Sequence, residues 1–388
     1  MSADGFQTSP RTRRRYRAEK RFKALCIAAL GVAGVFMALF FSDMIRKGYT
    51  AFAQTKIQAE VTYNERSVEI PLAAVGEDVR HLVSRGWLRQ IPNHVEADPS
   101  LMGQTVTRWI VADSTVDQYI KGQHTQLDDE QKAVVDRLVE NDRAQLGFNW
   151  TFFTNGDSKM PEIAGIKSAV VGSLYTLLVT MLVSFPIGVM TAVYLEEFAG
   201  DNRVSRAIEV NINNLAAVPS ILYGLLGLAV FINFFGVPRS SALAGGLTLA
   251  LMTLPIIIIS TRAALRAVPD SIREGAFGVG ASRLQVVAHH VLPLSLPGIL
   301  TGSIIGLAQA MGETAPLLIV GMMAFIPDAP GGFTDAATVL PAQIFTWASE
   351  PERAFAALTA AGILVLLVVL LALNGVAVWL RKRYEKRW

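Results

Sequence analysis

This chain of 388 residues has few cysteines and few charged residues, and it lacks a nucleotide-binding loop. Cys26 is the only cysteine, so no internal disulfide can form and any exported part must fold without one. Charged residues make up 17% of the chain, whereas about 25% is usual for a soluble domain. The pattern G-x-x-x-x-G-K followed by Ser or Thr is missing, so the chain cannot itself be a P-loop ATPase.

The scarcity of charge reflects long apolar runs. A helix needs roughly 20 residues to cross a bilayer. Six runs are long enough, near residues 24–42, 166–195, 209–235, 241–262, 298–325 and 355–380. The sequence therefore predicts an all-α polytopic membrane protein with six transmembrane helices, the first spanning residues 24–46. A cleaved signal peptide is the alternative for the first run, but the run is longer than usual and Arg46 and Lys47 separate it from the candidate cleavage site.

Basic residues predict the topology. They crowd into an N-terminal arm, residues 1–23, and a C-terminal tail, residues 381–388. Because basic flanks stay in the cytoplasm and six spans return the chain to one side, both termini are predicted to be cytoplasmic. A basic run beside an apolar span is usually a topology anchor, so the arm is not expected to bind nucleic acid.

Residues 47–165 lie between the first two runs and are predicted to be an extracytoplasmic domain. Two sets of apolar residues alternate with polar ones, as in half-buried strands: Ile57, Ala59 and Val61, then Val68, Ile70 and Leu72. An amphipathic helix is expected to begin at 128–131. We expect a small α/β or α+β fold. No metal site is predicted, because the spacing is too wide between the histidines His81, His94 and His124.

Glu313 is the leading candidate for a functional residue, because it falls within the fifth apolar run. An ionised side chain at bilayer depth costs about 2.5–3.5 kcal/mol, so it must protonate, face water or pair with a cation. Gln309 lies one helical turn earlier and Thr314 is adjacent. Asn214, near the start of the third run, is either an interface residue or a further part of a transport path.

The polar loop at residues 263–293 has the spacing of two short helices. Pro269 followed by Asp270 or Ser271 resembles a helix start, and Gly280 precedes a second helix that Pro293 is expected to end. The second helix carries an apolar stripe, made of Leu284, Val287, Ala288 and Val291. Such a loop either plugs into a groove on a partner protein or rests on the membrane interface, and the pattern alone leaves both open.

The loop also resembles the signature of ABC importer permeases, Glu-Ala-Ala, three residues, Gly, nine residues, then Ile-x-Leu-Pro. The matching residues are Glu274, Ala276, Gly280, Leu292 and Pro293; Gly275 and His290 depart from the signature. The resemblance implies that residues 271–292 form coupling helices that dock on a cytoplasmic ATPase. The residues implied in coupling are Glu274, Gly275, Ala276, Gly280, Leu284 and Pro293.

Among these permeases the chain is similar to the PstA family, which serves phosphate importers. The matching runs are 215–224, 265–269 and 312–318, and the resemblance covers about 166–380. It implies a type I ABC importer permease fold in the bacterial inner membrane. It also implies a transporter subunit for inorganic phosphate rather than an enzyme, with no cofactor of its own because ATP and Mg bind the partner ATPase.

The implied partners are a PstC-like sister permease, a dimer of PstB-like ATPase subunits, a PstS-like periplasmic phosphate-binding protein and membrane lipid. Many relatives carry Arg where this chain has Gln309, so a cation for phosphate would come from the sister permease or from Arg262 and Arg266. Two alternatives remain open. The substrate could be another oxyanion, such as molybdate or sulfate, or the chain could be a membrane receptor with residues 47–165 as its sensor.

Overall fold

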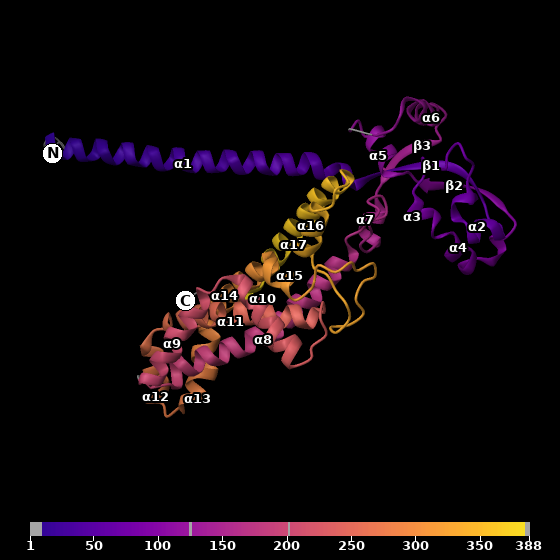
Figure 1. Ribbon diagram of the computed structural model, residues 1–388. Coiled ribbons are helices and arrows are strands. Elements are labelled where there is room, and N and C mark those ends of the chain that lie inside the picture. The colour runs from indigo at the N-terminus through magenta and orange to yellow at the C-terminus, as the bar shows by residue number, and fades with distance from the viewer. Residues whose placement is uncertain (1–9, 124–125, 201, 385–388) are drawn as a thin grey trace.

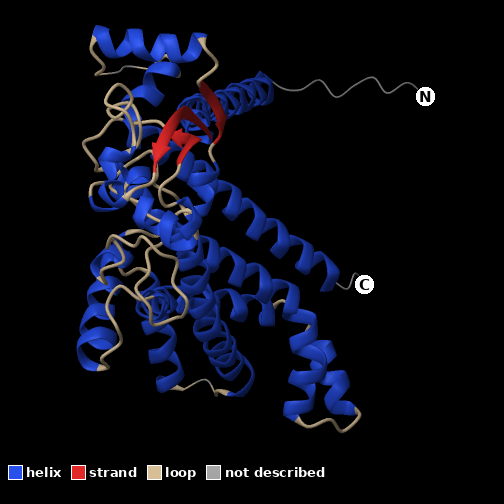
Figure 2. Cartoon of the chain, turned by 90° about the vertical axis from the view of Figure 1, so that its right-hand side faces the viewer, coloured by secondary structure: helices blue, strands red, loops and turns tan. Residues whose placement is uncertain are grey.

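The computed structural model describes residues 10–123, 126–200 and 202–384 (Figure 1). A bundle of long helices occupies one end, a small sheet lies at the other, and the first helix extends away from both. Figure 2 shows the strands gathered at one end, with long helices running away from them. Residues 1–9 of the basic arm, His124 and residues 385–388 of the tail lie outside the described residues.

Five described helices are long and apolar enough to cross a membrane. They are α1 (Pro10–Gly48), α8 (Lys167–Val193), α11 (Ala242–Arg266), α14 (Leu292–Gly312) and α17 (Ala354–Tyr384). A sixth span exists only if α9 (Arg203–Ala216) is joined to α10 (Ser220–Gly227) and its continuation to Phe234. The shorter helices of this part are α12 (Asp270–Gly278), α13 (Arg283–Val286), α15 (Ala315–Ile319) and α16 (Leu340–Ala348).

The third apolar run is bent rather than straight, so the span predicted near 209–235 is present only if the two helices on either side of the bend count as one broken span. α9 and the α10 segment meet at 104°. The bend falls at Ala217–Pro219, where the proline lacks an N–H and disfavours helical geometry for Val218. Small residues hold the rest of the bundle close: a Cβ on Gly188 of α8 would lie 2.7 Å from Ile257 of α11, so only glycine fits there.

Residues 47–165, called the inserted segment below, contain an antiparallel sheet. Its strands are β1 (Ala53–Thr62), β2 (Thr105–Val111) and β3 (Ala144–Phe148), in the order β2-β1-β3. Its helices are α2 (Glu65–Glu69), α3 (Arg85–Leu88), α4 (Ile91–Ala97), α5 (Ser114–Ile120), α6 (Asp129–Glu140) and α7 (Trp150–Thr154). The antiparallel strands and separate helices make this an α+β arrangement, as expected.

Two of the three local predictions for the inserted segment are confirmed. Ile57, Ala59 and Val61 are fully buried on β1, and Asp128 caps α6 in a reciprocal capping box with Gln131. The strand expected at Val68–Leu72 is wrong, because α2 and a 3₁₀ turn occupy these residues. Asn64 caps α2 through its side chain, and Pro71 has no N–H to offer a strand ladder.

The inserted segment is attached to the helical bundle by its last residues and by α5. The Trp347 Nε1–H of α16 donates to the buried Asp157 carboxylate at 3.1 Å, and Asp157 N–H donates to the Ile326 carbonyl at 3.2 Å. The Ser114 hydroxyl of α5 donates to Glu352, just before α17, at 2.6 Å. The sheet is therefore fixed to the same end of the bundle as α16 and the start of α17.

Candidate functional site

The predicted docking loop is a helical hairpin at the end of the bundle opposite the sheet (Figure 1). α12 is followed by Gly280, whose φ of +88° lies in the region that favours glycine. Ser282 then caps α13 in a capping box with Gln285. Pro269 occupies the N-cap position of α12 and Asp270 is already its first helical residue, so the predicted cap at Asp270 or Ser271 is wrong.

The second helix of the hairpin does not stop at Pro293, contrary to the prediction. α13 passes through a π-helical turn, Val287–Val291, directly into α14. Proline in a helix clashes with the carbonyl four residues earlier, and the wider π turn relieves this crowding. The result is one helical rod of 30 residues from Arg283 to Gly312, joining the docking loop to the middle of the bundle.

The two faces of the hairpin differ in exposure. Val286, Val287 and Val291 are buried, and Val286 and Val291 belong to a small core that also contains Leu265 and Ala276. Three large apolar side chains point outward instead: Phe277 is 47% exposed, Val279 86% and Leu284 67%.

The predicted apolar stripe is therefore wrong in part as a surface for a partner or the membrane, because Val287 and Val291 are buried within the chain and only Leu284 and Ala288 are exposed. The turn at Gly280 folds α13 back, so that Val286 shares the inner face. Glu274 and Gly275 are exposed beside the outward apolar group, whereas Ala276 is buried.

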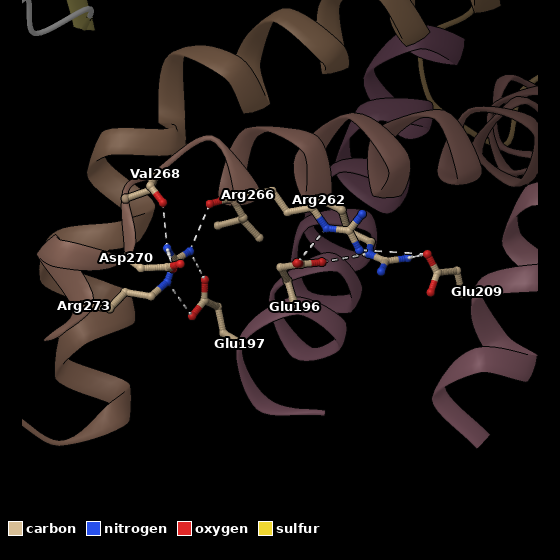
Figure 3. Close-up of polar contacts among 9 residues, drawn as sticks. Glu196, Glu197, Glu209, Arg262, Arg266, Val268, Asp270 and Arg273 are labelled. Atoms are coloured by element: carbon tan, nitrogen blue, oxygen red, sulfur yellow. Dashed lines mark hydrogen bonds and ion pairs between the residues drawn. The ribbon is translucent and has the colours of Figure 1, made fainter. Parts of the chain in front are cut away.

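Arg273 ties the hairpin to two long helices (Figure 3). Its Nη2–H donates to Glu197 Oε1 at 2.7 Å and to the Leu265 carbonyl at 3.0 Å, and its Nη1–H donates to the Val268 carbonyl at 2.8 Å. The two charged side chains are only 17% and 8% exposed. Glu197 lies in the π-helical end of α8, so one guanidinium connects α12 with the ends of α8 and α11.

A second group of ion pairs lies beside this one. Glu196 accepts from Arg262 at 3.1 Å and from Arg266 at 2.7 Å, and Glu209 of α9 pairs with Arg262 at 3.0 Å (Figure 3). Both arginines are thus balanced by carboxylates of the same chain. The sequence analysis did not identify Arg273, Glu196 and Glu197 as functional residues. The two adjacent acids at the end of the second apolar run were the feature that could have indicated an ion-pair site.

The structure does not bring these arginines near Glu313. Leu317 of α15 packs 3.2 Å from the position that a Cβ on Gly245 would take, near the start of α11. Arg262 comes about 17 residues later on the same helix, which is about 25 Å along its axis. Arg262 and Arg266 therefore belong with the docking loop.

Glu313 lies at a break between helices, so its predicted position inside a helix is wrong. α14 ends at Gly312, Glu313 is extended at φ −78° and ψ 128°, and α15 begins at Ala315. The cause is Pro316, whose ring would clash with the Gly312 carbonyl in an unbroken helix. Glu313 and Thr314 are half-buried, whereas Gln309, one turn before the break, is exposed.

This break lies beside α10, the helix that follows the bend at Ala217–Pro219. A Cβ on Gly224 of α10 would lie 2.7 Å from Pro316 Cα, so the helices touch backbone to backbone. The Tyr223 hydroxyl donates to the Leu215 carbonyl at 2.6 Å and satisfies a group near the bend. Asn214 is exposed on the last turn of α9. Non-helical backbone at membrane depth persists where protein buries it or where it lines a water-filled cavity, which makes these paired breaks the candidate transport site.

Residues 184–386, just over half of the chain, match the family described as "Binding-protein-dependent transport system inner membrane component". A second family, described only as a domain of unknown function, matches residues 9–72 and 69–130. That second match covers α1 and much of the inserted segment.

Several relatives align with the helical part. The probable ABC transporter permease protein YqgI of Bacillus subtilis is 34% identical over 181 residues, 47% of this chain and 60% of that protein. The phosphate transport system permease protein PstA 1 of Mycobacterium tuberculosis is 33% identical over 233 residues, 60% of this chain and 75% of that protein. PstA of Yersinia pestis is 31% identical over 213 residues, 55% of this chain and 71% of that protein.

The chain thus spans between 60% and 75% of the length of these relatives. A chain in an inward-facing structure of the MetNI methionine ABC transporter is 17% identical, with a TM-score of 0.44 over 57% of this chain and 95% of that one. The family match confirms the predicted permease fold. The chain belongs to the inner-membrane components of binding-protein-dependent transport systems, and it is a permease subunit of an ABC transporter rather than an enzyme.

Proposed function

We propose that this permease imports inorganic phosphate as part of an ATP-driven complex. Two of the relatives described above are named phosphate transport permeases, and the run 312–318 shared with that family falls on the break between α14 and α15. The observation that carries the mechanism is the continuous rod from Arg283 to Gly312, because it joins the docking loop to the transport site without a flexible link.

The complex contains a homologous sister permease, an ATPase dimer and a periplasmic phosphate-binding protein, of the PstC, PstB and PstS types. Both termini and the hairpin α12–α13 face the cytoplasm, where basic flanks remain. The inserted segment is then a separate extracytoplasmic domain over residues 47–165, on the side where the binding protein delivers phosphate.

The ATPase docks on the outward face of the hairpin, where Phe277, Val279 and Leu284 present apolar surface beside Glu274. Its movement reaches the bundle by two routes. The first is the Arg273–Glu197 pair, which pulls on the ends of α8 and α11. The second is the rod itself, which is about 45 Å long. Because it is continuous, a displacement of α13 at one end moves the break at Glu313 at the other.

Phosphate passes between this chain and the sister permease, past the exposed residues Gln309 and Asn214. Asn214, Gln309 and Thr314 offer neutral hydrogen-bond donors to an anion. Glu313 alone would repel phosphate, so we assign it the role of a gate element that is protonated or paired across the interface. Because Arg262 and Arg266 are balanced within this chain, the sister permease supplies the cation.

Uptake of radiolabelled phosphate at micromolar concentration tests this proposal. Cells without their own high-affinity system receive the four components, with this subunit present or omitted. We expect uptake that needs this subunit and ATP and that excess sulfate or molybdate does not reduce. Competition by either oxyanion would overturn the substrate assignment, and uptake that persists without this subunit, with the rest of the complex inserted, would overturn its role.

A further inference from the structure

We propose that an aromatic shelf, made of Phe52, Phe148, Trp150 and Phe153, lies in the outer interfacial layer of the bilayer and holds the inserted segment down against the membrane. The proposal uses the topology given above, but contact with lipid can be measured whatever the substrate is. The partner is a lipid surface, recognised through aromatic rings at the depth of the headgroups.

The shelf is one continuous set of rings. Phe148 lies 4.9 Å from Trp150, centroid to centroid, and stacks on Phe153 at 5.8 Å with an interplanar angle of 2°. Phe153 stacks in turn on Phe52 at 5.9 Å. Three of the rings remain open to the surroundings, since Phe148 is 50% exposed, Trp150 66% and Phe153 38%.

The shelf sits at the level where the spans end on the sheet side. Phe52 comes four residues after the end of α1, and α7, which carries Trp150 and Phe153, leads toward α8. Behind the shelf, Phe152 contacts Trp347, which lies beside Phe355 in the first turn of α17. Ala51, just after α1, Ala169 at the start of α8 and Phe355 at the start of α17 share one buried cluster with Phe152, so the shelf is at the level where these spans end.

Its chemistry fits the bilayer boundary better than water. Trp and Tyr are enriched at membrane–water interfaces, where an apolar ring lies among headgroups and its polar edge stays hydrated. Tyr49 is exposed between the shelf and the end of α1, and the exposed Arg46 precedes it, at a level where long basic side chains reach lipid phosphates, whereas Lys47 pairs with Asp43 at 2.7 Å. The shelf also continues the exposed apolar surface of α1, which the membrane must cover.

Trp109 supplies the matched control. It is 38% exposed on β2, which lies across β1 from β3 and so on the opposite edge of the sheet from Phe148. It is of the same residue type, in the same segment, but has no described aromatic ring stacked on it. The shelf proposal predicts lipid contact at Trp150 and none at Trp109.

Site-directed quenching tests the proposal on the full chain, assembled with its sister permease and ATPase in lipid nanodiscs. Cys26→Ser removes the native thiol, and Trp150→Cys or Trp109→Cys introduces one label site for an environment-sensitive fluorophore. Nitroxides are placed on the lipid headgroup or deep in the acyl chain. We expect headgroup nitroxide to quench the label at 150 at least about twice as strongly as the label at 109, with iodide in water showing the reverse order.

Two outcomes would overturn the proposal. Equal quenching by iodide at both positions would mean that the shelf stands in water. Protection of position 150 from iodide and from both nitroxides would mean that a protein surface covers it. Both labels replace exposed side chains. Phosphate uptake by the labelled complexes tests the proposed transport function separately, so failure of either proposal can be told apart from failure of the other.

Discussion

Removal of Arg273 is expected to uncouple the docking loop from the bundle. Arg273→Ala deletes the ion pair with Glu197, a contact with the exposed Asp270, and two hydrogen bonds to the Leu265 and Val268 carbonyls at and just after the end of α11. Removing one partner of a buried ion pair costs about 3–5 kcal/mol, because the other charge stays buried without a counter-ion. With side chains 17% and 8% exposed, the lower value of about 3 kcal/mol applies, roughly a hundredfold shift in the equilibrium between attached and detached α12.

The assay is phosphate imported per ATP hydrolysed, in proteoliposomes that contain the whole complex. We expect this ratio to fall at least about tenfold for Arg273→Ala. Arg266→Ala is the control: its side chain is 57% exposed, and Arg262 continues to balance Glu196, so its loss should cost less than about 1 kcal/mol. A double variant with Glu197→Gln and Arg273→Ala has no unpaired buried charge, so its ratio of phosphate imported to ATP hydrolysed should be higher than that of Arg273→Ala alone. Wild-type coupling in Arg273→Ala, or no recovery in the double variant, would refute this reasoning.

Three other perturbations follow from the same geometry. Glu313→Gln should reduce phosphate uptake without blocking assembly, and uptake at the wild-type rate would remove Glu313 from the mechanism. Gly224→Ala should destabilise the contact with Pro316 by about 1–3 kcal/mol in thermal unfolding, whereas Gly375→Ala, with open space around its Cβ, should not. Burial raises the pKa of Glu162 from 4.5 to about 7, with Asp113 and Glu352 adding to the rise. The folded inserted segment therefore holds a proton that the unfolded chain releases above pH 4.5, so its stability should fall by up to about 3 kcal/mol as pH rises from 4.5 to 7, at about 1.4 kcal/mol per pKa unit. Glu162→Gln should show a much smaller fall in chemical denaturation, since the pKa of Asp157, which burial also raises, leaves a contribution of the same sign.

The sequence predicted the elements whose cause is local. The length of the apolar runs was sufficient to predict α1, α8, α11 and α17 as spans, because a span is a stretch of consecutive apolar residues. The alternation at Ile57–Val61 gave β1, and the capping residues at 128–131 gave the start of α6. Alternation failed at Val68–Leu72, where a capping residue before the run and a proline within it outweighed the period-two pattern.

The arrangement of the candidate site depends on contacts between distant residues. Glu197 and Arg273 lie 76 positions apart, and no spacing rule connects them. The break at Glu313 was foreseeable in part, since Pro316 stands three residues later, but the run of apolar residues on both sides suggested one helix. The break packs against α10 because Gly224 allows close contact with Pro316, and only the packed structure shows this contact.

The strand order of the inserted segment has a consequence for how the chain is made. β1 is the central strand and emerges directly after the first span, but both of its neighbours come later, β3 ending at Phe148. At the usual 5–20 residues per second, the stretch from Thr62 to Phe148 takes on the order of 4–17 s to synthesise. During that time the longest strand of the sheet keeps at least the edge for β3 open, and until Val111 is made it keeps both edges open, at the mouth of the translocation channel. Glu352, the hydrogen-bond partner of Ser114, is synthesised more than two hundred residues later. The last helix therefore inserts beside a sheet whose three strands have already paired.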